Sequence, residues 1–301
     1  MTPTTADHEQ NSVVTSGAVE RKQQKSSLGL LLLLPVLLVV AAFGVYPVIV
    51  LILRSFGIGE VGIYETPGPT VMYYREALRS AFIARSIRDS IIVGIGSVII
   101  TVTLSIPTVL YLAKRSRANR PMPALDALLT FPITLPGIII GFFSIVLLGR
   151  NGLAGQFLPV LAGVAFTYLG FFIAYVFFSI PRIVGPLRGA AEMMNPDYAE
   201  TAETLGASKL RAFWTIQLPL ILPAAIEASG AAAAVALGGY GTAATLSEGI
   251  RLLPLDVVDA LNNGFNIATS SALAVILALL ALVAILAGRL LARVLESGLK
   301  S

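Results

Sequence analysis

Long apolar runs alternate with shorter polar segments along this chain. Six runs are apolar on every helical face, and each exceeds the roughly 20 residues that a helix rising 1.5 Å per residue needs to cross ~30 Å of hydrocarbon. Membrane-spanning strands would instead alternate polar and apolar positions over about 10 residues. We therefore predict an all-α membrane protein with six transmembrane helices, over residues 28–53, 90–113, 125–148, 157–180, 220–246 and 271–295.

The two ends of the chain differ from the spanning region 28–295. Residues 1–27 are rich in Ser, Thr, Gln and charge, and so little apolar surface predicts a disordered tail. The first apolar run is too long for the core of a cleavable signal peptide, which has roughly 7–15 residues, so we interpret it as a retained helix. Residues 296–301 form a short polar C-terminal end.

Composition excludes a water-soluble globule. Hydrophobic residues make up 56% of the 301 residues and charged residues 13%, against roughly 25% charged in an ordinary soluble domain. The chain has no cysteine, which excludes a disulfide framework and a thiolate nucleophile. The formal charge of +4 does not indicate nucleic-acid binding, because no basic face with interleaved aromatic residues is present.

The distribution of Lys and Arg predicts the orientation in the membrane. The segments 1–27, 114–124, 181–219 and 289–301 hold most of the basic residues and all of the lysines. Because cytoplasmic loops carry such an excess, we predict that both termini face the cytoplasm. The loop 54–89, on the predicted outer side, is an exception that carries five arginines.

Several catalytic and conducting sites lack their sequence motifs. No glycine-rich run ends in Gly-Lys-Ser/Thr, so the chain is not expected to hydrolyse ATP itself. There is no His-Glu-x-x-His, and the one histidine, His8, lies in the predicted tail, so no metal site is expected. Gly239-Tyr240-Gly241 resembles a potassium-channel filter, but Leu237-Gly238 replaces the expected Thr-Val.

The segment 181–219 has the clearest local signals of all the polar segments. Asn195 can cap a helix, and Pro196 is tolerated in its first turn, so we predict a short helix over about 196–205. Gly206 can end that helix in the left-handed conformation. Ser208 can cap a second short helix that continues toward Ile216.

This segment resembles the EAA loop of the permease subunits of ATP-binding cassette importers. That signature is Glu-Ala-Ala, three residues, Gly, nine residues, Ile, any residue and Leu-Pro. The chain matches it, at the expected spacing, at Glu200, Ala202, Gly206, Ile216, Leu218 and Pro219. It departs at Thr201, where Ala is usual, and at Glu203, which is often Arg.

The resemblance implies a type I importer permease fold and a set of partners. These are a second permease subunit of the same or a related chain, two ATPases that bind ATP and Mg²⁺, and an extracytoplasmic solute-binding protein. The chain itself is then no enzyme and holds no cofactor. The ATPase-coupling residues that it implies are Glu200, Thr201, Ala202, Leu205, Gly206, Ala207 and Ser208.

Further residues resemble the permeases of polyamine, iron, thiamine, phosphonate, molybdate and sulfate importers. They include Leu135-Pro136-Gly137 and the cluster Gly238, Gly239, Tyr240 and Gly241. In many relatives that cluster reads Gly-Glu-Phe-Gly, so the role of the missing carboxylate cannot be transferred. Glycines permit a break in the helix, and the cluster is a candidate gate in the translocation path, although ordinary packing of small residues would give the same pattern.

An ion-gradient-driven secondary transporter is the alternative function. It would require an ionisable side chain at membrane depth and usually an internal repeat. Glu227 could serve as that side chain, or it could be solvated near the helix end or paired with a basic residue of a neighbouring chain. No convincing repeat relates the two halves of the chain. The sequence does not identify the transported substrate.

Overall fold

The computed structural model describes residues 33–59 and 69–300. The predicted tail, including His8, lies outside the described residues. The chain divides into two compact units, Met1–Leu53 and Arg54–Ser301.

The first unit contains most of a single apolar helix. Leu33–Ser55 is one candidate membrane span, with a π-helical turn η1 (Ala41–Val45) that continues as α2 (Tyr46–Ser55). None of the residues 33–49 is buried within the protein. An apolar helix that is exposed on every face suits a lipid environment.

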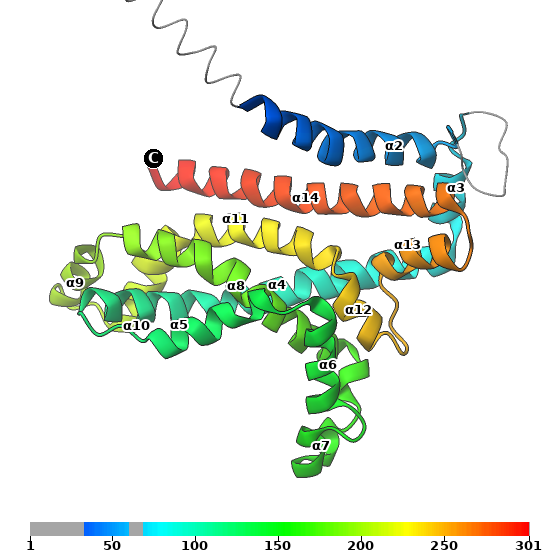
Figure 1. Ribbon diagram of the computed structural model, residues 1–301. Coiled ribbons are helices and arrows are strands. Elements are labelled where there is room, and N and C mark those ends of the chain that lie inside the picture. Colours follow the sequence, from blue (N-terminus) through cyan, green and yellow to red (C-terminus); the bar gives the residue numbers. More distant parts are fainter. Residues whose placement is uncertain (1–32, 60–68, 301) are drawn as a thin grey trace, which may run out of the picture. The chain divides into compact units, whose positions relative to one another are not determined.

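The second unit contains the remaining helices, whose order can be followed in Figure 1. They are α3 (Met72–Arg79), α4 (Ala81–Arg117), α5 (Pro123–Thr130), the short turn η2 (Phe131–Thr134), α6 (Gly137–Leu148), α7 (Leu153–Phe157), the turns η3 (Pro159–Leu161) and η4 (Val164–Phe166), α8 (Tyr168–Met193), α9 (Asp197–Thr204), α10 (Lys209–Ala212), the π-helical turn η5 (Phe213–Gln217), α11 (Leu218–Leu237), α12 (Tyr240–Leu246), α13 (Leu253–Asn262) and α14 (Ile267–Lys300).

The main core lies where α4, α8 and α11 pack together. Val109 of α4, Ile183 and Leu187 of α8, and Ile221 and Ala225 of α11 are completely buried there. Fully burying one such aliphatic side chain contributes about 1.5–3 kcal/mol. This core fixes the two helices, α8 and α11, that flank the predicted coupling segment.

A second core connects α6, α8 and α12 around glycines. A Cβ on Gly141 of α6 would lie 2.8 Å from Thr245 Cβ of α12. Thr242 Oγ1 of α12 donates a hydrogen bond to the Gly137 carbonyl oxygen (2.9 Å). The small residues of α6 therefore allow the backbones of α6 and α12 to approach closely, as in other membrane helix pairs.

The small residues of α11 allow close packing against α14. A Cβ on Gly230 would lie 2.7 Å from the Ala284 carbonyl oxygen and 3.0 Å from Gly288 Cα. The backbones of α11 and α14 therefore approach closely at this crossing.

Six helices of the described residues are long and apolar enough to cross a membrane, which confirms the predicted number. The spans are Leu33–Ser55, Ala81–Arg117, Gly137–Phe157, Tyr168–Met193, Lys209–Leu237 and Ile267–Gly298. Residues 28–32 of the first predicted run lie outside the described residues, and the other ends differ from the prediction.

The largest corrections concern the third, fourth and fifth spans. The third was predicted to start at residue 125, but Leu135 is extended before Pro136 and interrupts the helix, because the residue before proline disfavours the helical conformation. The fourth was predicted to end at Ile180, but α8 continues through Pro181 and Pro186 to Met193. The fifth starts at Lys209, and it ends at Leu237 because the chain breaks at Gly238-Gly239.

Candidate functional site

The α8–α11 loop, residues 194–208, is the part of the segment 181–219 that lies between the two spanning helices. Asn195 Oδ1 accepts a hydrogen bond from the Asp197 N–H (3.0 Å), and α9 then runs from Asp197 to Thr204. Gly206 ends α9 with φ +92°, and Ser208 Oγ caps the next helix by accepting from the Arg211 N–H (3.3 Å). The predicted helix start, glycine stop and serine cap are confirmed.

The second helix, predicted as a short one that continues toward Ile216, does not stop there. Instead α10, η5 and α11 form one continuous span, Lys209–Leu237. Proline is tolerated in the first turn of a helix, and Pro219 falls at the start of α11, directly after the π-helical turn. π-helical turns are frequent at functional sites.

The predicted coupling residues lie on two sides of the α8–α11 loop. Leu205 is 84% exposed, and Thr201 and Gly206 are also exposed. Glu200 is exposed as well and lines a cavity behind the loop. Ala202 and Ala207 are half-buried, and Ser208 is used as a helix cap.

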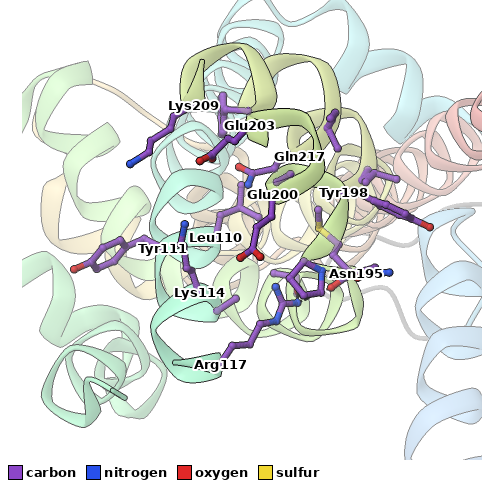
Figure 2. A pocket seen from close by; sticks show the side chains of 18 of the residues that line it. Leu110, Tyr111, Lys114, Arg117, Asn195, Tyr198, Glu200, Glu203, Lys209 and Gln217 are labelled. Atoms are coloured by element: carbon purple, nitrogen blue, oxygen red, sulfur yellow. Dashed lines mark hydrogen bonds between the residues drawn. The ribbon is translucent and has the colours of Figure 1, made fainter. Parts of the chain in front are cut away.

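That cavity has a volume of about 510 Å³ and lies between α9, η5 and the ends of α4 and α8. Its charged lining residues are Lys114, Arg117, Glu200, Glu203 and Lys209. Figure 2 shows the Glu200 side chain on the same side of the cavity as Lys114 and Arg117. No nitrogen of these basic residues lies within 4.0 Å of a carboxylate oxygen of the described residues. The cavity therefore holds both signs of charge without ion pairs.

Arg117 fastens the base of the α8–α11 loop to α4. Its Nη2 donates to the carbonyl oxygens of Ala191 (2.7 Å), Glu192 (3.2 Å) and Met194 (2.6 Å). Carbonyls at a helix C-terminus have no partner within the helix, and they carry partial negative charge. Sequence reasoning used Arg117 only to predict orientation and missed this contact.

A second link joins α8 to α5. Arg188 Nη1 donates to Asp126 Oδ1 (2.6 Å) and its Nε donates to Glu192 Oε1 (3.0 Å). The last turns of α8 are thus bonded both to α4, through Arg117, and to α5, through Asp126, and these contacts fix the start of the loop.

The predicted gate residues lie at a break in the helix. α11 ends at Leu237 and α12 begins at Tyr240. Tyr175 of α8, which is 1% exposed, donates its hydroxyl to the Gly239 carbonyl oxygen (2.9 Å). Tyr240 is 43% exposed, while Gly241 packs so tightly that a Cβ would lie 2.9 Å from the Ile138 nitrogen. A role of Gly238, Gly239, Tyr240 and Gly241 in gating stays a prediction.

An ion-pair cluster lies beyond the break. Arg251 bonds Asp256 Oδ1 through Nε (2.5 Å) and Asp259 Oδ2 through Nη2 (2.6 Å), and its guanidinium carbon lies 5.2 Å from the Phe82 ring centroid. The Asn263 amide donates to Asp259 Oδ1 (2.5 Å). This hydrogen bond, together with the charge of Arg251, lowers the pKa of the Asp259 carboxyl below its ordinary value.

Glu227, the candidate coupling residue of a secondary transporter, faces a cation of the same chain. Its Oε1 lies 3.8 Å from Arg289 Nε, and both side chains are 60% exposed. The described residues contain no cluster of three or more His, Cys, Asp or Glu that could hold a metal ion.

A family model described as "Binding-protein-dependent transport system inner membrane component" matches residues 80–300. The chain belongs to this family. The match spans α4 to α14 and therefore includes both the α8–α11 loop and the helix break. The protein is accordingly a multi-pass component of the bacterial inner membrane.

Curated relatives of the family match parts of the chain. The molybdenum transport system permease protein ModB of Mycobacterium tuberculosis is 36% identical over 166 residues, which are 54% of this chain and 62% of that protein. ModB of Escherichia coli K12 is 32% identical over 176 residues, 56% of this chain and 77% of that protein. The sulfate transport system permease protein CysT of Salmonella typhimurium is 37% identical over 118 residues, 39% of this chain and 43% of that protein.

Solved structures share the fold. A bacterial ABC transporter involved in the import of the acidic polysaccharide alginate has a TM-score of 0.71 and 17% identity, over 92% of this chain and 98% of that chain. The same kind of transporter in complex with an alginate pentasaccharide-bound periplasmic protein has a TM-score of 0.70 and 16% identity, over 89% of this chain and 94% of that chain. The expected type I importer permease fold is thereby confirmed.

Proposed function

We propose that this chain is the permease subunit of an ATP-binding cassette importer, in which separate subunits hydrolyse ATP. The observation that carries the proposal is the α8–α11 loop. Its tip exposes Leu205 almost completely, whereas its base is hydrogen-bonded to Arg117. An exposed apolar tip on a fixed base suits docking into a groove of a partner that pushes and pulls on the loop.

The proposed partners are two ATPases on the side of the α8–α11 loop, a second permease subunit, and a solute-binding protein on the opposite side. The family description names binding-protein dependence, and one structural neighbour includes a periplasmic protein. ATP and Mg²⁺ would bind to the ATPases. At the docking contact, Gly206 allows the chain to turn, and the small side chain of Ala202 allows the two protein surfaces to approach closely.

The substrate class that we propose is a tetrahedral dianionic oxyanion, such as molybdate or sulfate. The support is the similarity to permeases named for molybdenum and sulfate transport. No observation favours the gradient-driven alternative, since Glu227 is exposed and lies beside Arg289.

The experiment replaces Gly206 in the complete transporter, reconstituted with its ATPases and binding protein in proteoliposomes. A non-glycine residue in the left-handed region costs roughly 1–2 kcal/mol, and a β-branched side chain would also alter the docking surface. We expect Gly206→Val to retain ATP hydrolysis and to lose most of the uptake of labelled molybdate or sulfate. The matched control is Gly249→Val, because a Cβ at Gly249 meets nothing within 4 Å and Gly249 has no positive φ.

Undiminished uptake by Gly206→Val would contradict the coupling role of the loop. Uptake that persists without ATP, and that follows an imposed ion gradient instead, would contradict the importer proposal itself.

A further inference from the structure

The candidate spanning helix α8 carries a cation well inside its own length. Arg182 lies 11 residues before Met193, the last residue of α8, which corresponds to about 16 Å at 1.5 Å per residue. The sequence analysis placed Arg182 in a polar loop, so this position within the span is a finding of the structure. Ionisable side chains inside spanning helices are costly and mark functional sites by default.

Arg182 has no opposite charge beside it. Its guanidinium carbon lies 3.8 Å from the centroid of the Phe178 ring, and its Nη1 donates to the Phe178 carbonyl oxygen. Among the described residues, no carboxylate oxygen lies within 4.0 Å of its nitrogens, and its other N–H groups have no protein acceptor. Phe178 thus holds the guanidinium plane while the remaining donors stay available.

The face of α8 that continues from Arg182 is open. Gly185 and Gly189 follow at i+3 and i+7, which places them on the same side of the helix, and both are exposed. A Cβ on either glycine would meet nothing within 4 Å. Many exposed positions of the other spanning helices carry large apolar side chains, such as Ile99 and Leu104 of α4. The α8 face instead combines a cation with free space, which suits a polar path better than lipid.

We propose that Arg182 forms an anion-binding site in the translocation path and contacts the tetrahedral dianionic oxyanion as it crosses the membrane. This inference rests on the proposed function and specifies one contact within it. The planar guanidinium fork can donate two parallel hydrogen bonds to an oxyanion. A single cation without a surrounding cage binds the anion only weakly, as conduction requires, because the anion must also leave.

The test compares Arg182→Gln, Arg182→Lys and wild type in the complete transporter in proteoliposomes, with radiolabelled molybdate and sulfate as probes. We expect Arg182→Gln to lower the maximal uptake rate at least about tenfold, as for the loss of a charged hydrogen-bond partner. The apparent KM should be unchanged, because the binding protein captures the solute first. Arg182→Lys should retain an intermediate rate, since it keeps the charge but loses the fork. Arg293→Gln, which removes an exposed charge of α14, is the control and should transport normally.

A second variant blocks the approach to Arg182 without removing it. Gly185→Leu fills open space on the exposed face of α8, so the chain should fold as before. We expect a lower maximal uptake rate, with ATP hydrolysis and permease–permease association intact. Loss of that association would identify this face as a subunit contact and would overturn the proposal.

The lipid composition distinguishes the transported anion from a lipid phosphate as the ligand of Arg182. In vesicles of phosphatidylcholine alone and in vesicles with phosphatidylglycerol, the defect of Arg182→Gln should be the same. A defect confined to vesicles with the anionic lipid would overturn the proposal.

Uptake by wild type and by Arg182→Gln separates the substrate class from the site at Arg182. If wild type takes up neither molybdate nor sulfate with ATP, the proposed substrate class is wrong. If wild type takes up either anion and Arg182→Gln does so at the same rate, the proposed function stands and the site at Arg182 is refuted.

Discussion

Replacing Arg117 by Gln should loosen the base of the α8–α11 loop. The guanidinium donates to the carbonyl oxygens of Ala191, Glu192 and Met194 over 2.6–3.2 Å. Hydrogen bonds from a charged group contribute about 1.5–3 kcal/mol, and a cation at a helix C-terminus adds about 0.3–1 kcal/mol. Because Arg117 is exposed, water compensates for part of these contributions in the variant, and we expect the loop base to lose about 1–2 kcal/mol of local stability.

The assay is hydrogen exchange, measured by mass spectrometry on the purified protein in lipid nanodiscs. A local loss of about 1–2 kcal/mol corresponds to roughly 5–30-fold faster exchange, confined to peptides that cover the end of α8 and the α8–α11 loop. Arg120→Gln is the matched control, because Arg120 lies nearby, is exposed and makes no side-chain hydrogen bond within the described part of the chain. Equal exchange in wild type and Arg117→Gln would show that the hydrogen bonds of Arg117 do not stabilise the base of the loop. Faster exchange throughout the second unit would indicate general destabilisation instead.

Two further predictions concern the packing of α6 on α12 and the ion-pair cluster around Arg251. Gly141→Val should prevent stable packing of α6 on α12, because the Cβ of the new valine would overlap Thr245. Such overpacking costs about 1–3 kcal/mol. Thermal unfolding in detergent should therefore show a lower Tm, which the second substitution Thr245→Ala should partly restore. The pKa of the Asp259 carboxyl is below its ordinary value. The interactions of the ionised carboxylate therefore stabilise the protein fully above pH ~4, the pKa of an unfolded aspartate. This stabilisation is lost as the pH falls through the lower pKa of the folded state. Asn263→Ala should therefore reduce the Tm near neutral pH more than at pH 3, and an equal reduction at both pH values would contradict the assignment.

The signals that could be predicted from the sequence are local. Asn195, Gly206 and Ser208 act through hydrogen bonds and backbone conformations within a few residues, so the start and end of α9 follow from residue type. The number of spans could also be predicted, because each apolar run is long enough to cross a membrane even when its ends are misplaced by several residues.

The ends of the spans depend on tertiary packing, which the sequence does not display. The apolar run was predicted to end at residue 180, but α8 continues through Pro181 and Pro186, although a proline inside a helix costs about 3 kcal/mol or more. The same stretch buries Ile183, Val184 and Leu187 against α4 and α11, and each of these contributes about 1.5–3 kcal/mol. The gain from packing is comparable to the cost of the prolines, so α8 continues to Met193. Arg182 then lies inside a span rather than in a loop.

The contacts of the candidate site were beyond prediction for the same reason. Arg117 lies 74 residues before Ala191 in the sequence, and Tyr175 lies 64 residues before Gly239. Neither residue belongs to a recognisable motif, and each has its role only because α4, α8 and α11 pack side by side.

The two helices that flank the α8–α11 loop meet again at the break that precedes α12. α8 is continuous from Tyr175 to Met193, a rise of about 27 Å, and Tyr175 donates its hydroxyl to Gly239. The span Lys209–Leu237 begins just after the loop and ends beside the same glycine. Packed helices shift as rigid elements rather than bending freely, so a displacement of the loop would reach Gly239 along both helices. The hydrogen bond from Tyr175 joins α8 directly to the break at the end of the second route. We therefore expect the Gly238-Gly239 break, rather than Tyr240 alone, to respond when the loop moves.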